Sequence, residues 1–319
     1  MKRITVCLIL VLSAQQRVDA QVITLGTGVN AFSIDFVQIG NPGNAADTSG
    51  SPNPAGSVSY IYSIGKYEIS REMIDKANLI ANLGITLADM TSYGGNGAKK
   101  PATGIGWYEA ARFVNYLNES FGRQAAYKFD ANGNFQMWSP TDAGYNGNNQ
   151  FRNNLAMFFL PSSHEWYKAA YGSPSGTWYK YPTGSNTAPR AVVSGTDPNT
   201  AVLPLISSPP NYSADIDQAG GLSAWGTMAQ GGNTWEWTES AFDGINDSVS
   251  ENREVRGGSA GSAGGPDFSS LMSTVRYDDT ILREPNDLGF RVAMIPEPSA
   301  VSLLAIGLGA LAMMRRLRS

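Results

Sequence analysis

The stretch Gly231–Ser240 reads GGNTWEWTES and contains one carboxylate between two large aromatic side chains. Successive side chains of a β-strand point to opposite faces, so Trp235 and Trp237 would share one face and Glu236 would lie on the other. One interpretation is an aromatic core strand with an outward carboxylate. The other is a site built around Glu236. This stretch alone does not distinguish the two interpretations, so other features of the sequence are needed.

The composition indicates a loop-rich globular protein. The chain has 319 residues, of which 42% are hydrophobic and only 16% are charged, with 35 glycines and 17 prolines. This length can bury a sizeable core in one large domain or two small ones. The abundance of turn residues argues against a helical bundle, and the hydrophobic content argues against disorder.

The N-terminal segment has the order of a secretory signal. Lys2 and Arg3 precede the apolar run Ile4–Leu12, and small residues follow at Val18–Ala20. We expect residues 1–20 to be a signal peptide that signal peptidase removes before Gln21.

The C-terminal segment, 295–319, has three parts. Pro296-Glu297-Pro298 is followed by the uncharged apolar run Ala300–Met314 and then by the basic end 315–318. The apolar run is short for a membrane span, although flanking residues can extend it, and the arginines would stay on the cytoplasmic side.

This tripartite tail resembles the PEP-CTERM sorting signal of Gram-negative bacteria, which exosortase recognises. The resemblance implies export across the inner membrane with a transient transmembrane anchor there. The final destination would be the cell surface, the outer envelope or the extracellular matrix.

The charge and the reactive side chains exclude several classes of function. The chain is acidic, with a formal net charge of −4, and the two terminal segments carry more basic than acidic residues. The remaining domain is therefore more acidic still, which argues against a nucleic-acid partner. Cys7 is the only cysteine and His164 the only histidine, so the domain 21–294 has no thiol and no histidine cluster for a metal.

Three segments have the pattern of amphipathic helices. The first begins after Ser70 and ends at Gly84, and the second follows Gly106 and ends before Gly122. The third lies between Ser162, which forms a capping box with Glu165, and Gly172. His164 falls in the first turn of this helix, where a solvated or capping role is expected rather than catalysis.

Strand composition occurs at Phe32–Phe36 and Val58–Tyr67, and a hairpin is predicted over Tyr127–Phe135 with its turn at Asn132-Gly133. A calcium loop through Asp130 is an alternative to the hairpin. The glycine is misplaced for an EF-hand and no glutamate follows at the required spacing, so the turn is favoured.

Six motifs in order carry a family resemblance. They are IGKYEIS (Ile64–Ser70), WYEAARFVNYL (Trp107–Leu117), FFLPSSHEWYKAAYG (Phe158–Gly172), GGNTWEWTES (Gly231–Ser240), REVRGGS (Arg253–Ser259) and LGFRVA (Leu288–Ala293). The set resembles the formylglycine-generating enzyme, or sulfatase-modifying factor, family over about residues 25–294. The resemblance implies a single α+β domain with a C-type-lectin-like fold and little regular secondary structure.

The enzymes of this family oxidise a sulfatase cysteine with O2 and a copper ion held by two cysteines that follow the Gly-Gly-Ser motif. The first of these positions falls on or near Ser262, and the second has no counterpart. Another branch uses iron held by histidines of an additional N-terminal domain, which this chain lacks. We therefore expect neither copper nor iron, and no catalytic residue is assigned.

The family resemblance also implies structural calcium. One site corresponds to Gly232, Thr234 and Glu236, although Ala229 stands where the family usually offers an oxygen ligand. Asp215 and Asp217, in the turn-rich segment Tyr181–Ala219, are candidate contributors to a second site. Glu236 would then be a metal ligand.

The favoured hypothesis is a non-catalytic binding or structural module with an unidentified envelope or matrix partner. One alternative is a formylglycine-generating-type oxidase, or a related enzyme, with an atypical site. Another is a carbohydrate-binding module, since aromatic and asparagine side chains are abundant and lectins share the broad fold.

Overall fold

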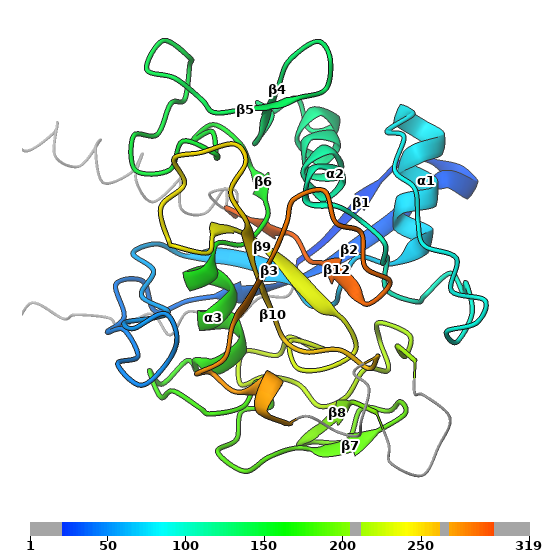
Figure 1. The fold of residues 1–319 in the computed structure, drawn as a ribbon, viewed down its shortest axis with the longest axis vertical. Coiled ribbons are helices and arrows are strands. Elements are labelled where there is room, and N and C mark those ends of the chain that lie inside the picture. The colour runs from blue at the N-terminus through cyan, green and yellow to red at the C-terminus, as the bar shows by residue number, and fades with distance from the viewer. Residues whose placement is uncertain (1–20, 205–211, 262–267, 297–319) are drawn as a thin grey trace, which may run out of the picture.

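The computed structural model describes residues 21–204, 212–261 and 268–296 of the chain. Figure 1 shows the larger sheets at the centre, with helices beside them and long connecting loops at the periphery. The expected α+β class with little regular secondary structure is confirmed.

The larger sheet has five antiparallel strands in the order β1-β2-β3-β13-β6. Its strands are β1 (Gln21–Leu25), β2 (Phe32–Ile39), β3 (Tyr62–Gly65), β13 (Ala293–Met294) and β6 (Phe158–Phe159). The expected strand at 32–36 is confirmed and extends further. The expected strand at 58–67 is shorter at both ends, because only Tyr62–Gly65 pair with the neighbouring strands β2 and β13.

The smaller sheet has four strands in the order β11-β10-β9-β12. They are β11 (Tyr277–Asp279), β10 (Arg253–Arg256), β9 (Trp235–Ala241) and β12 (Leu288–Phe290). β12 pairs with β9 in parallel, and the other two pairings are antiparallel. The stretch Gly231–Ser240 thus provides a central strand of this sheet.

Two further strand pairs and two 3-10 turns complete the strand and turn elements. They are β4 (Lys128–Phe129) with β5 (Phe135–Gln136), β7 (Arg190–Val192) with β8 (Thr200–Val202), η1 (Gly28–Asn30) and η2 (Phe268–Leu271). The predicted hairpin is β4–β5. Asp130 organises its turn by accepting the backbone N–H groups of Asn132 and Asn134 through Oδ1, at 2.8 and 2.9 Å.

The three predicted helices are α1 (Arg71–Ala81), α2 (Trp107–Ser120) and α3 (Ser163–Tyr171). Their caps follow the sequence, and α3 has the expected box between Ser162 and Glu165. α1 ends earlier than predicted, because Asn82 adopts the left-handed conformation that closes the helix before Gly84 is reached.

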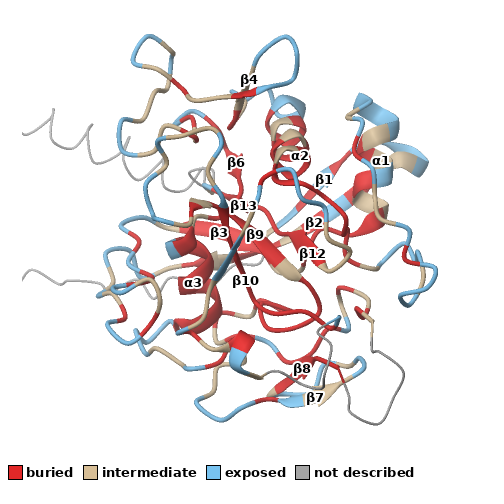
Figure 2. Ribbon diagram, viewed as in Figure 1, coloured by how far each residue is buried: buried red, intermediate tan, exposed pale blue. Residues whose placement is uncertain are grey.

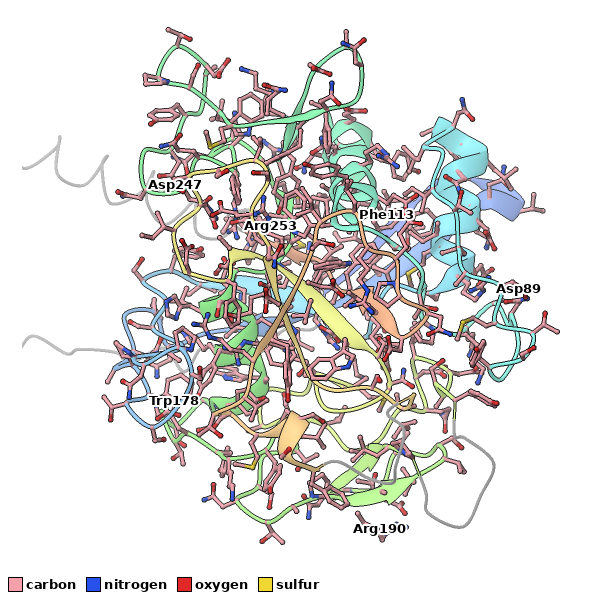
Figure 3. All side chains as sticks on the ribbon, in the orientation of Figure 1. Asp89, Phe113, Trp178, Arg190, Asp247 and Arg253 are labelled. Carbon is pink, nitrogen blue, oxygen red and sulfur yellow. The ribbon has the colours of Figure 1, made fainter. Side chains whose placement is uncertain are left out.

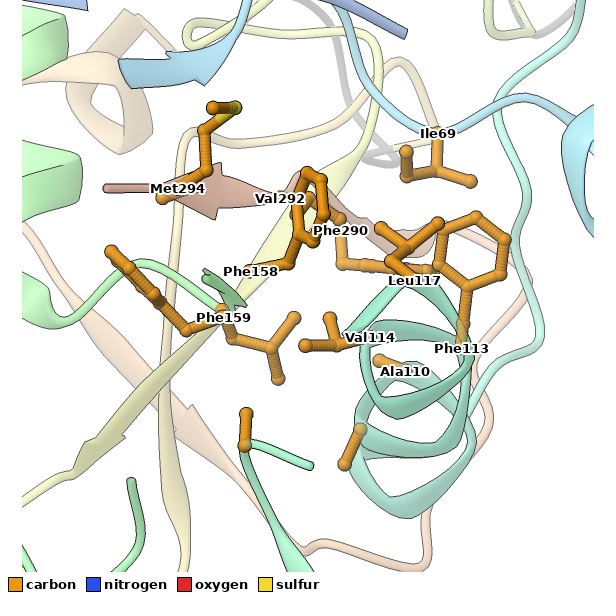
Figure 4. Packing of buried hydrophobic residues seen from close by; sticks show 14 of the residues in the cluster. Ile69, Ala110, Phe113, Val114, Leu117, Phe158, Phe159, Phe290, Val292 and Met294 are labelled. Atoms are coloured by element: carbon orange, nitrogen blue, oxygen red, sulfur yellow. The ribbon is translucent and has the colours of Figure 1, made fainter. Parts of the chain in front are cut away.

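The main core lies between α2 and the five-stranded sheet (Figure 4). Phe113, Val114 and Leu117 on one face of α2 are fully buried, and the ring centroid of Phe113 lies 6.3 Å from that of Phe32 in β2. Figure 2 shows burial concentrated along the central strands and α3, with exposed residues mainly in the outer loops.

No helix of the described residues is long and apolar enough to cross a membrane. The predicted membrane segment Ala300–Met314 and the predicted signal peptide lie outside the residues that the structure describes. Pro296 is described, whereas Glu297 and Pro298 of the predicted sorting motif are not.

Candidate functional site

Glu236, near the start of β9, is completely buried and paired with Arg291. Nε and Nη2 of Arg291 donate to the two oxygens of the carboxylate at 2.6 and 2.5 Å. The indole N–H of Trp166 in α3 donates to the same carboxylate at 2.7 Å. A bidentate guanidinium–carboxylate pair of this kind combines charge with fixed geometry. The interpretation of Glu236 as an outward carboxylate is therefore wrong.

Arg291 uses its remaining N–H groups to join distant segments. Nη1 donates to the carbonyls of Gly65 and Lys66, and Nη2 donates to the carbonyl of Met228 at 2.9 Å. The segments IGKYEIS, FFLPSSHEWYKAAYG, GGNTWEWTES and LGFRVA therefore meet at one ion pair. The sequence motifs mark these segments separately, but no motif indicates that Arg291 is their common partner.

The predicted calcium ligands have other partners in the structure. Gly232 has a positive φ of 86°, and a Cβ there would clash with the carbonyl oxygen of Val202, so only glycine fits. Thr234 donates its hydroxyl to Glu68 at 2.8 Å. Both oxygens of Glu236 face N–H groups, an arrangement that does not fit a cation. Calcium binding stays a prediction, and Glu236 could serve it only after releasing Arg291.

The other calcium candidates are engaged by lysines. Asp217 forms an ion pair with Lys99 at 2.7 Å, and Asp215 lies 3.8 Å from Lys100. Among the residues of the three described ranges, no cluster of three or more histidine, cysteine or acidic side chains could hold a metal ion. His164 is exposed on α3 and accepts the backbone N–H of Gly56 at 3.0 Å, so it forms part of a loop contact.

Glu68 is a second buried carboxylate beside the same pair. It accepts hydrogen bonds from Asn233 at 2.6 Å and from Thr234. Burial and the charge of Glu236 raise the pKa of Glu68 to about 8, against the smaller opposing effect of Arg291. One guanidinium thus faces two carboxylates, and Glu68 is protonated at neutral pH.

A cleft opens at the N-terminal end of β9, with a volume of about 260 Å³. Trp235 and Tyr277 form one wall, with ring centroids 5.2 Å apart and an edge-to-face orientation. Val255 and Leu288 are buried beneath them, and the rim carries Asp278, Asp279, Arg283 and Asp287. The cleft therefore offers aromatic surface at its wall and mainly negative charge at its rim.

Asp287 connects the cleft with the Gly-Gly-Ser turn. Its carboxylate accepts the Ser259 hydroxyl at 2.8 Å, and its carbonyl accepts the backbone N–H of Trp235 at 2.9 Å. Asp287 also lines a second, smaller cavity, together with Gly261. Ser262, the position expected for a copper-binding cysteine, lies outside the described residues. Asp287 is a residue of the site that the predictions from the sequence do not include, and its only sequence signal is its position directly before LGFRVA.

The chain belongs to the sulfatase-modifying factor enzyme 1-like domain family, whose model matches residues 35–295. Its fold is similar to that of CarF, with a TM-score of 0.59 and 19% identity over 83% of this chain and 99% of CarF. PvdO from Pseudomonas aeruginosa has a TM-score of 0.53 and 15% identity, covering 86% of this chain and 98% of PvdO.

Treponema denticola variable protein 1 has a TM-score of 0.50 and 18% identity, covering 86% of this chain and 99% of that protein. Identities this low show a shared fold alone. The search of curated proteins found no match. The predicted family and fold are thus confirmed, and the sorting signal stays a prediction.

Replacing Glu236 with glutamine is expected to destabilise the protein strongly. The substitution keeps the shape of the side chain but leaves the buried Arg291 without a counter-charge, which costs about 3–5 kcal/mol of unfolding free energy. Urea unfolding followed by tryptophan fluorescence measures the loss. Glu72→Gln is the matched control, since the partly exposed pair of Glu72 with Lys76 in α1 contributes less than about 1 kcal/mol. Equal stability of Glu236→Gln and wild type would contradict the buried ion pair between Glu236 and Arg291.

Glu68 should make stability fall as the pH rises. The unfolded state releases the Glu68 proton near the ordinary glutamate pKa of 4.5, whereas the folded state retains it up to about pH 8. Between these two pKa values the folded state binds more protons than the unfolded state. The free energy of unfolding therefore decreases, by up to about 1.4 kcal/mol for each unit by which the pH rises. Unfolding curves of wild type and Glu68→Gln across this range should converge or cross with rising pH. Parallel curves would show that the Glu68 pKa is not raised.

Proposed function

We propose that this member of the family is an exported binding module of the cell surface or extracellular matrix, which keeps the family's scaffold without its formylglycine chemistry. One observation carries this proposal: Cys7, in the predicted signal peptide, is the only cysteine of the chain. The cleft beside Ser259 and Asp287 therefore has no thiolate of this chain to hold a metal.

The chemistry of copper explains why this matters. Cu(I) prefers soft thiolate or thioether ligands, and a serine hydroxyl is hard and remains protonated at neutral pH. A site in which Ser262 stands near the first cysteine position cannot hold Cu(I) comparably, and the second ligand has no counterpart. The lone His164 is on the exposed side of α3, in contact with Gly56. It does not replace the missing ligands.

The retained cleft supports binding rather than turnover. Tyr277 is 49% exposed and stands against Trp235, so the wall presents a fixed aromatic surface to solvent. Asp287 is held by Ser259, and Asp278 accepts the side-chain amide of Asn252 at 2.7 Å. Such a rigid, partly apolar concavity with a few positioned polar groups is typical of a binding site. Its partner in this proposal is a component of the envelope or matrix.

The purified protein is expected to have no formylglycine-generating activity. Protein loaded with copper and given a sulfatase peptide should leave the peptide cysteine unmodified, as judged by mass spectrometry. Ser262→Cys should be equally inactive, because a single thiolate does not restore the pair of ligands. Turnover above the background of copper without protein would favour the alternative of an oxidase with an atypical site.

Export predicts two cleavage events. Signal peptidase should produce a mature N-terminus near Gln21, and exosortase should remove the tail near Pro296–Pro298. The intact mass of protein isolated from the native cell surface measures both ends at once. A cytoplasmic pool that retains both termini would contradict the proposal.

A further inference from the structure

A second concavity lies at the opposite end of β9 from the cleft. Two cavities of about 330 and 270 Å³ meet at Asn149 and Ser162, and we refer to them together as the amide groove. Ser240, near the end of β9, lines the groove, whereas Trp235 lines the cleft. Asp247, labelled in Figure 3, belongs to the loop on one side of the groove.

Uncharged amides dominate the lining of the groove. Seven asparagine or glutamine side chains line it, most of them from the loop between β5 and β6. The side-chain amides of Asn148, Gln150 and Asn154 make no hydrogen bond to any residue within the described ranges. Each of these amides has two donor hydrogens and an acceptor oxygen available for a ligand.

Arg152 is the one cationic side chain among the described residues that line the groove, and two buried carboxylates neutralise it. Nη1 and Nη2 donate to Glu165 at 2.9 and 2.8 Å, and Nε donates to Glu239 at 2.7 Å. Burial alone would raise the pKa of Glu165, but Arg152 holds this pKa below its ordinary value, so the carboxylate is ionised. The guanidinium also stacks on Phe159 at 3.7 Å from the ring centroid. The described residues around Arg152 therefore offer no unpaired positive charge to an anionic ligand.

The groove is held in shape before any ligand arrives. Asn149 donates to Glu239 at 2.5 Å and accepts the side-chain amide of Asn246 at 2.9 Å, which joins the two loops across the groove. Tyr60 donates its hydroxyl to Glu165 at 2.5 Å, and the residue as a whole remains 40% exposed. A site whose polar groups are fixed in advance loses less entropy on binding.

We propose that the amide groove binds a neutral oligosaccharide, an inference that rests on the proposed binding function and names a ligand class for a second site. A sugar hydroxyl can accept a hydrogen bond from an amide N–H and can donate one to an amide oxygen, so it matches both groups of the free side-chain amides. The exposed ring of Tyr60 offers a surface on which a sugar can stack. The two cavities together provide space typical of a small ligand rather than a macromolecular surface. The negative floor, with Asp247 at the rim, disfavours sulfated or uronic-acid sugars.

The test uses the purified protein on an array that contains neutral hexose oligosaccharides and their sulfated and uronic-acid counterparts. Wild type should bind neutral members. The variant Asn148→Ala/Gln150→Ala/Asn154→Ala should bind them at least about tenfold more weakly, since it removes several ligand hydrogen bonds. These side chains make no structural hydrogen bond within the described ranges, so the variant should keep the melting temperature of wild type.

Two controls separate the groove from the rest of the molecule. Gln124→Ala removes an exposed amide outside both cavities, and Trp235→Ala alters the cleft, so both should bind neutral oligosaccharides as wild type does. Absence of neutral binding, unchanged binding by the triple variant, or a preference for charged sugars would overturn the proposal. Capture of an envelope partner through the cleft without sugar binding would also overturn it, while leaving the proposed function intact. Formylglycine production would overturn the proposed function instead.

Discussion

The buried guanidinium of Arg291 is the constraint on which the architecture depends. Arg291 lies in the short link between β12 of the four-stranded sheet and β13 of the five-stranded sheet. Its charge cannot remain in the interior without a counter-charge, and Glu236 on β9 supplies one in bidentate geometry. The backbone carbonyls that accept its other N–H groups come from segments with little regular structure. One side chain therefore fixes how the two sheets and the connecting loops meet.

Other buried charged and amide side chains also hold loop segments in place. They explain how a large domain can be stable with few strands and helices. Glu254 is fully buried between Arg256 and Arg276 and accepts the hydroxyl of Ser163 at 2.6 Å. Asn118 on α2 accepts the backbone N–H groups of Met157 and Phe158 at 2.7 and 3.0 Å. Buried loop backbone needs such partners, because it lacks the regular ladders of sheets and helices. The ionic and amide networks are thus the framework that holds both the cleft and the amide groove.

Local features of the fold could be predicted from the sequence, because they depend on neighbouring residues. The caps of α1 and α3 and the β4–β5 turn each involve side chains within four positions of one another. The ion pair could not be predicted in this way. Arg291 is 55 positions from Glu236, and the parallel pairing of β12 with β9 that brings them together leaves no periodic pattern. The setting of Glu236 between two tryptophans marks it as a candidate site residue, but this local pattern does not indicate that Arg291 pairs with it.

The cleft and the amide groove could not be predicted from the sequence for the same reason, because their residues come from segments that meet only in the folded chain. Trp235 could be identified from the sequence, yet its companions Tyr277 and Asp287 come from other segments and join it only in the folded chain. The amide groove depends on a loop without periodicity, whose asparagines become a site because Arg152 anchors that loop to Glu165 and Glu239. Composition suggested abundant amides, but only tertiary contacts decide which of them remain free for a ligand.

The most direct test of this account is a double-mutant cycle of Glu236→Gln and Arg291→Met, measured by urea unfolding with calcium and with a chelator. The account predicts a coupling energy of about 2–3 kcal/mol that is the same in both conditions, since the two side chains stabilise each other directly. Additive effects of the two substitutions, or a coupling that is present only with calcium, would contradict it.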